Sequence, residues 1–174
     1  MNNNTFIHKY LETLITKNDV VVDMTMGNGN DTYFLATKTK HVYSFDINDE
    51  ALINTKERCE SLNNITLIKD NHINVDNYIK DKVKLFIFNL GYLPYSKETT
   101  ITKASDTLIA FKKAYNLLID NGYIIITFYL GQSGGYDEYY SLDKYINDNN
   151  LCVIDSYQKH QSIDEPITYI IKKY

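Results

Sequence analysis

Residues 20–31 read VVVDMTMGNGND and combine a strand, a glycine turn and the start of a helix. The valine run is typical of a buried strand that ends at Asp23. Gly27 and Gly29 allow positive φ or a close approach to a ligand, and Asp31 opens a helix. A plain glycine-rich turn has the same residues. Because the strand, the glycines, the acidic residues and the helix start occur together, we favour a nucleotide or nucleoside site.

Outward from this stretch, strand and helix patterns alternate along the chain. A short amphipathic helix in HKYLETLI, within an N-terminal helical segment 1–18, precedes strands predicted at 19–23, 41–46, 65–69, 83–89, 121–130, 151–158 and 166–173. Helices are predicted near 31–38, 49–62, 75–81, 104–118 and 136–149. This pattern predicts a mostly parallel sheet covered by helices on both faces. Only the short polar KHQSIDE separates the last two strands, which fits an antiparallel hairpin.

Length and composition limit the class of protein. A chain of 174 residues with 44% hydrophobic content predicts one domain, 1–174. A net charge of -4 argues against a general nucleic-acid coat but allows local contact with RNA. The sequence has no signal-peptide pattern and no apolar run long enough for a membrane span, so we expect a cytoplasmic protein. Cys59 and Cys152 lack metal-ligand spacing, and no metal is expected.

Two further predicted strands end in a carboxylate. Asp46 follows Asp23 by 23 residues, where a carboxylate can accept hydrogen bonds from ribose hydroxyls. Asp46 is also placed to cap the next helix. Asp70 can accept a hydrogen bond from an adenine amino group, although Asp70 or Asn71 also suits an ordinary turn. His72 is ambiguous between a structural and a catalytic role, since the sequence shows no partner for it.

The fourth predicted strand ends in FNLGYLP, residues 88–94. The Asn89 amide emerges at the ligand edge, and Gly91 with Pro94 fixes a loop that presents Tyr92. The segment is either a rigid turn or a methyl-acceptor site. Its place after the fourth strand of this series favours the acceptor site.

Together with SFDIN, GQSGGYDE and PITYIIK, these motifs resemble class I S-adenosylmethionine (SAM)-dependent methyltransferases from about residue 20 onward. More narrowly, they resemble the small bacterial family labelled rRNA methylases. The resemblance implies a Rossmann-like α/β fold with strand order 3-2-1-4-5-7-6, an antiparallel C-terminal hairpin and SAM as cofactor. It also implies a tRNA methyltransferase that converts the 5-aminomethyl group of wobble 2-thiouridine to 5-methylaminomethyl.

The resemblance also assigns site residues. Around SAM, the motif glycines and their acidic neighbours would contact or shape the methionine end, Asp46 would bind the ribose, and Asp70 with Asn71 the adenine. The implied cofactor-binding set is Asp23, Gly27, Asn28, Gly29, Asn30, Asp31, Asp46, Ile47, Asp70, Asn71, His72 and Asn89. The predicted substrate-binding set is Gly91, Tyr92, Leu93 and Pro94, together with Lys97 and Lys103, which flank the loop after FNLGYLP.

For catalysis, we hypothesise that the Asn89 oxygen or a nearby carbonyl accepts an N–H of the acceptor amine. Tyr92 would border or stack on the uracil, and Glu138 would assist proton loss. The chain departs from the family at residues 95–98, which read YSKE where a Gly-Gly-Asp-Lys-like run is usual. It also has Gln132-Ser133 in place of a His-Pro pair, which rules out a catalytic histidine there.

The predicted partner is a tRNA anticodon arm, and the limited surface of so small a domain favours a homodimer. Two alternatives stay open at this point. The enzyme would methylate rRNA or another base amine, or the chain would be an NAD-binding oxidoreductase or a noncatalytic nucleotide-binding domain. Thr32 argues against NAD, because it stands where a GxGxxG turn needs its third glycine.

Overall fold

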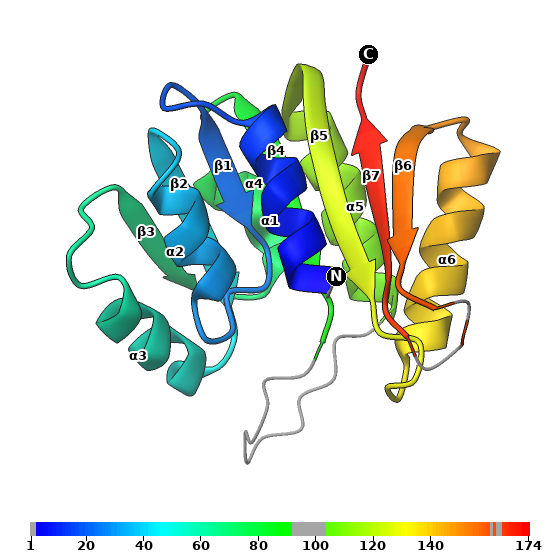
Figure 1. Ribbon diagram of the computed structural model, residues 1–174, viewed down its shortest axis with the longest axis horizontal. Coiled ribbons are helices and arrows are strands. Elements are labelled where there is room, and N and C mark those ends of the chain that lie inside the picture. The colour runs from blue at the N-terminus through cyan, green and yellow to red at the C-terminus, as the bar shows by residue number, and fades with distance from the viewer. Residues whose placement is uncertain (1–2, 92–103, 161, 163–164) are drawn as a thin grey trace.

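A computed structural model describes residues 3–91, 104–160, 162 and 165–174. Its centre is a seven-stranded sheet of order β3-β2-β1-β4-β5-β7-β6 (Figure 1). The strands are β1 (Val20–Asp23), β2 (His41–Asp46), β3 (Ile65–Lys69), β4 (Val83–Asn89), β5 (Leu118–Phe128), β6 (Cys152–Gln158) and β7 (Ile167–Lys172). The first five are parallel neighbours, and β7 pairs antiparallel with both β5 and β6. The predicted strand order and C-terminal hairpin are therefore confirmed.

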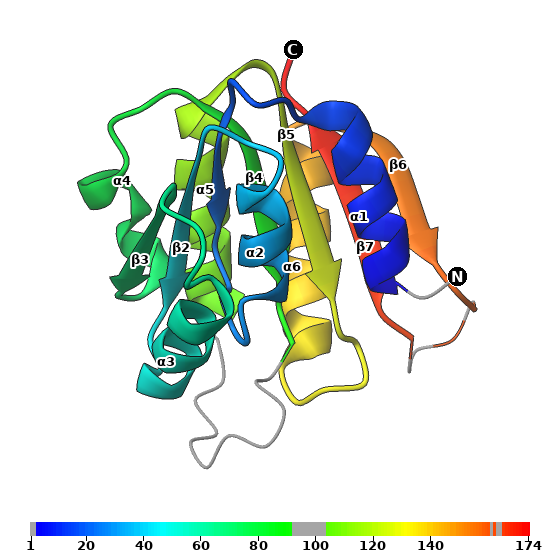
Figure 2. The same ribbon diagram turned by 60° about the vertical axis from the view of Figure 1, so that its left-hand side comes forward.

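Helices cover both faces of the sheet, as Figures 1 and 2 show. The helices are α1 (Asn3–Leu14), α2 (Asn30–Ala36), α3 (Asp49–Arg58), η1 (His72–Asn74), α4 (Val75–Tyr78), α5 (Ala104–Leu117) and α6 (Gly135–Asp148). The larger core lies under α4, α5 and α6, and the smaller one under α1 and α2. Adjacent residues of one strand face opposite cores, for example Val21 and Val22 of β1. The uninterrupted apolar runs of the central strands follow from burial on both sides.

Element boundaries differ from the prediction mainly around β5. This strand begins at Leu118, three residues before the predicted 121–130, and ends at Phe128. Asn121 has φ 59 and precedes Gly122, whose added Cβ would lie 2.8 Å from the Ile119 carbonyl oxygen. The pairing with β4 shifts register between Val83 and Leu85. β5 thus includes a backbone irregularity near Asn121, and the apolar run that predicted the strand begins only after it.

The carboxyl ends of β1 to β5 lie along one edge of the sheet, and α1 begins at that same edge (Figure 1). Ile7 and Leu11, one helical turn apart, are buried against the sheet. Within the described ranges, no helix is long and apolar enough to cross a membrane.

Leu11→Ala tests how firmly α1 is docked. The side chain has 0% exposure, so its truncation leaves a cavity and should lower the free energy of unfolding by about 2–5 kcal/mol. Lys9→Ala, on the exposed side of the same helix, should change it by less than about 0.5 kcal/mol. Urea denaturation curves of the two variants measure the difference, and equal midpoints would contradict the docking of α1.

Candidate active site

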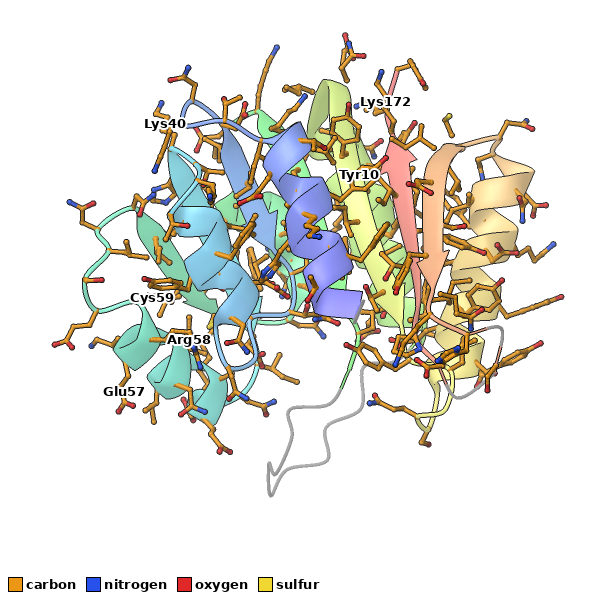
Figure 3. All side chains as sticks on the ribbon, in the orientation of Figure 1. Tyr10, Lys40, Glu57, Arg58, Cys59 and Lys172 are labelled. Carbon is orange, nitrogen blue, oxygen red and sulfur yellow. The ribbon has the colours of Figure 1, made fainter. Side chains whose placement is uncertain are left out.

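The glycine turn after β1 is packed against helix α3. Gly29 has φ 73, and a Cβ there would lie 2.7 Å from Thr55 Oγ1 and 2.9 Å from Thr55 Cα. Thr55 Oγ1 donates to the Gly27 carbonyl at 3.2 Å. Arg58 Nε donates to the Asn28 carbonyl at 2.7 Å, and Arg58 lies at the end of α3 in Figure 3. Only glycine fits at position 29, and its lack of a side chain lets α3 pack directly against the turn.

Asp23 ends β1 and is buried beneath this turn, with 1% exposure. Thr32 Oγ1 donates to Asp23 Oδ2 at 2.6 Å and lies 2.9 Å from Ser44 Oγ, while the Thr25 amide donates to Oδ1. Burial raises the pKa of the Asp23 carboxyl, and the nearby Asp31 carboxylate raises it further. Asp23 therefore shapes the turn from below.

Asp46 ends β2 with both carboxylate oxygens oriented by backbone amides. The Gly27 amide donates to Oδ2 and the Asn48 amide to Oδ1, each at 3.0 Å. Each oxygen keeps a lone pair for a further donor, because a carboxylate accepts about four hydrogen bonds. Asp46 thus stabilises the start of α3 and still presents acceptors suited to ribose hydroxyls. Ile47 beside it is 42% exposed, an apolar surface of the kind that a purine ring covers.

At the end of the third strand, the Asp70 carboxylate is occupied by hydrogen bonds from residues that follow it closely in the chain. The Asp70 carboxylate accepts hydrogen bonds from the Asn71 amide, Asn74 Nδ2 and Tyr78 Oη. Partial burial raises the pKa of Asp70, but these three donors outweigh it and lower the pKa overall. Asp70 therefore shapes its own turn, the alternative that the sequence left open, and its role toward adenine stays a prediction.

His72 acquires the partner that the sequence did not show. Its Nδ1 lies 3.1 Å from the Met24 carbonyl oxygen, which makes Nδ1 the protonated nitrogen. Its Nε2 is buried and is the one such side-chain atom in the described residues without a hydrogen-bond partner. Burial lowers the pKa of His72 and so keeps the ring neutral. The ring presents an unused acceptor beside the predicted cofactor edge.

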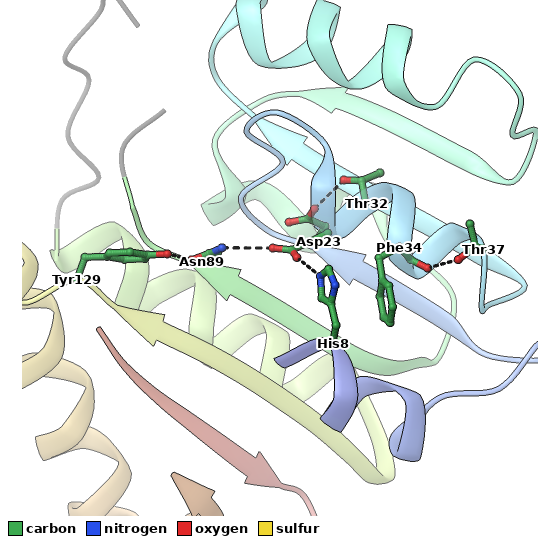
Figure 4. Close-up of polar contacts among 8 residues, drawn as sticks. His8, Asp23, Thr32, Phe34, Thr37, Asn89 and Tyr129 are labelled. Atoms are coloured by element: carbon green, nitrogen blue, oxygen red, sulfur yellow. Dashed lines mark hydrogen bonds and ion pairs between the residues drawn. The ribbon is translucent and has the colours of Figure 1, made fainter. Parts of the chain in front are cut away.

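Asn89 ends β4 at the centre of a hydrogen-bonded chain that crosses the sheet edge (Figure 4). Asn89 Nδ2 donates to Asp31 Oδ2 at 3.3 Å, and Tyr129 Oη donates to Asn89 Oδ1 at 2.8 Å. The second Asp31 oxygen lies 2.8 Å from His8 Nε2. The Asn89 backbone amide donates to Thr25 Oγ1. The side-chain amide of Asn89 is thus fixed by one hydrogen bond at each end, and the backbone of Asn89 is fixed by a third.

Tyr129 packs its ring against Gly91, where an added Cβ would lie 3.1 Å from Tyr129 Cε2. Burial raises the pKa of the Tyr129 phenol, so it stays protonated and can donate to Asn89.

Glu138, in the first turn of α6, is 4% exposed and accepts a 2.7 Å hydrogen bond from Thr107 Oγ1. Burial raises the pKa of Glu138 to about 7, with the Thr107 bond acting in the opposite direction.

The structure brings together most of the predicted residues and adds others. The turn residues, Asp46 and Asn89 gather at one edge, whereas Tyr92, Leu93, Pro94, Lys97 and Lys103 lie outside the described residues, as does the YSKE departure. Sequence reasoning missed His8 and Tyr129. Tyr129 directly follows β5, but the strand predicted at 121–130 extends past it, so the strand-end rule does not point to it. His8 has no such signal, because only the packing of α1 brings it to Asp31.

The sheet order, the reversed last strand and the acidic strand ends define a class I SAM-dependent methyltransferase. Residues 42–172 match the model of the family described as "Putative rRNA methylase", and the chain belongs to this family.

Several known proteins are similar to this chain. A tRNA (mnm5s2U34)-methyltransferase of Arabidopsis thaliana chloroplasts is 34% identical over 75% of this chain, a match that spans 54% of that protein. A "putative methyltransferase" of Streptococcus mutans, crystallised with SAH, is 33% identical with a TM-score of 0.90, covering 100% of this chain and 99% of the other. A "putative rRNA-methylase" of Clostridium thermocellum is 35% identical with a TM-score of 0.91, covering 100% and 98%.

Glu138→Gln tests the cost of ionising this buried carboxyl. A raised pKa in the folded state means that the favourable contribution of the protonated group is complete below the ordinary value near 4.5 and is lost as the pH rises through about 7. The glutamine variant lacks this loss, so its stability relative to the wild type should increase between pH 4.5 and pH 7. Asp137→Asn, exposed in the same turn, is the control and should show no comparable trend. Urea denaturation across this pH range would contradict the prediction if both variants behaved alike.

Proposed function

We propose that the chain is a SAM-dependent tRNA methyltransferase that N-methylates the 5-aminomethyl group of wobble 5-aminomethyl-2-thiouridine. The observation that carries the proposal is the Asn89 amide, fixed at the central strand end with Asp31 on one side and Tyr129 on the other. Membership of an RNA methylase family and the similarity to the Arabidopsis enzyme support an RNA substrate. The anticodon arm and a homodimer remain parts of the proposal.

The cofactor side of the proposal rests on residues that fit SAM. The Asp46 oxygens are oriented as acceptors for ribose hydroxyls, and exposed Ile47 offers an apolar surface to adenine. Gly27 and Gly29, both at positive φ, give the methionine part access to the backbone. Asp31 and Asp46 make this edge acidic, which suits the positive charge of a sulfonium. When bound, SAM supplies an activated methyl carbon.

On the acceptor side, Asn89 has the chemistry to orient an amine. Its Oδ1 accepts one hydrogen bond from Tyr129 and has a second lone pair for a substrate N–H. That bond would aim the nitrogen lone pair at the methyl group in line with the breaking carbon–sulfur bond. The alkylamine arrives as an ammonium and must lose a proton first. As the acceptor of that proton we propose Glu138, a buried carboxyl whose pKa is raised to about 7.

The substrate is tested with purified protein, SAM and two matched tRNAs. We expect a mass gain of one methyl group at the wobble nucleoside of tRNA bearing 5-aminomethyl-2-thiouridine, measured by nucleoside mass spectrometry. The same tRNA lacking the aminomethyl group is the control and should gain nothing, because it offers no amine at that position. Methylation of rRNA with no reaction on the aminomethyl tRNA would favour the rRNA alternative and reject this proposal.

Two variants separate the cofactor half of the site from the acceptor half. Asn89→Ala should lower the methylation rate about tenfold or more while SAM binding changes little, because an orienting bond to the acceptor is lost. Asp46→Asn should weaken SAM binding about tenfold, because the ribose loses a charged acceptor. Calorimetry with SAM and single-turnover methylation measure the two effects. A wild-type rate for Asn89→Ala would remove Asn89 from the acceptor site.

A further inference from the structure

We propose that His8 of α1 is a positioning residue for methyl transfer, acting through Asp31 to fix the orientation of the Asn89 amide. The inference rests on the proposed function and extends it to a helix outside the strand-end motifs. The linkage is continuous: His8 Nε2 lies 2.8 Å from Asp31 Oδ1, and Asp31 Oδ2 accepts from Asn89 Nδ2 at 3.3 Å (Figure 4).

The Asn89 amide has two chemically different ends, and Asp31 decides which way they point. An ionised carboxylate only accepts hydrogen bonds, so the NH₂ group must face Asp31. The amide oxygen then faces Tyr129, whose hydroxyl donates to it at 2.8 Å. A reversed amide would set its oxygen against the carboxylate and its NH₂ against the phenolic hydrogen. The orientation that leaves an oxygen for the acceptor amine therefore depends on Asp31.

His8 holds that carboxylate in place. The Asp31 side chain is 11% exposed and that of His8 is 29% exposed, so little water competes for their hydrogen bond. Because Asp31 accepts, His8 must carry a hydrogen on Nε2. The imidazole is itself fixed by stacking on Phe34, with ring centroids 4.0 Å apart and planes at 11°.

Helix α1 makes His8 a rigid donor. Ile7 on one side of it is buried in the core, as is Leu11 one turn later. Phe6 stacks on Tyr157 of β6 with ring centroids 4.3 Å apart. The helix is thus tied to the sheet both before and after His8. Since a displacement of about 1 Å in a reacting group can cost about a hundredfold in rate, a fixed donor at this point has a direct effect on turnover.

Two substitutions distinguish the hydrogen bond from the stacking. His8→Phe keeps an aromatic ring on Phe34 but has no donor, and His8→Gln keeps a donor near the position of Nε2. At saturating SAM we expect the single-turnover rate on aminomethyl tRNA to fall about tenfold or more for His8→Phe and to stay within about threefold for His8→Gln. Because Asp31 also belongs to the predicted SAM-binding set, SAM affinity is measured separately by calorimetry, and the rates are compared at saturating SAM. Lys9→Ala, exposed on the same helix, is the control.

A wild-type rate for His8→Phe, or an equal loss in both variants, would overturn the proposal. His8→Met is a second variant without a donor, in case His8→Phe does not fold. The linkage can also be measured without RNA, from the side-chain amide signals of Asn89 in ¹H–¹⁵N spectra, identified by their loss in Asn89→Ala. These signals should shift in His8→Phe and change much less in His8→Gln; no shift would overturn the linkage. A wild-type protein that leaves aminomethyl tRNA unmodified would instead reject the proposed function.

Discussion

The carboxylate of Asp31 joins three parts of the molecule that are distant in sequence. One oxygen lies against His8 of α1 and the other accepts from Asn89 of β4, while Asp31 itself belongs to the first turn of α2. A carboxylate this buried is costly unless each oxygen has a donor. The site therefore needs α1 docked, the glycine turn closed and β4 in register at the same time. Undocking of α1 or a shift of β4 leaves one Asp31 oxygen without its donor.

Asp23 and Asp46 show how two similar strand ends acquire different roles. Both are aspartates that form the last residue of a parallel strand. Asp23 ends the shorter central strand and is enclosed by Thr25, Thr32 and the turn above it. Asp46 lies one strand further out, where backbone amides orient its oxygens and leave the outer side open. The position of each strand in the sheet, which depends on strand order, therefore makes Asp23 a buried structural residue and Asp46 the candidate ribose ligand.

The sequence was sufficient for features that depend on local pattern. Apolar runs located all seven strands, and the strand-end rule located Asp46 and Asn89 at one edge. It failed where the structure depends on contacts between distant segments. Nothing in HKYLETLI indicates that His8 meets Asp31, since the contact spans 23 residues and requires the finished sheet. Asp70 differs, because its partners Asn74 and Tyr78 lie only four and eight residues further along the chain, and a turn role was one of the two interpretations that the sequence left open.

The charge of the site edge constrains what can approach it. Asp31 and Asp46 concentrate negative charge around the strand ends, while Lys40 and Lys172 lie at the opposite edge of the sheet (Figure 3). Such an edge attracts a sulfonium or an alkylammonium and repels phosphate. Under the proposed function, the aminomethyl cation of the nucleotide would enter first and the phosphate backbone would stay away from the carboxylates. For the substrate proposed above, this charge favours approach of the modified base over approach of the phosphate backbone.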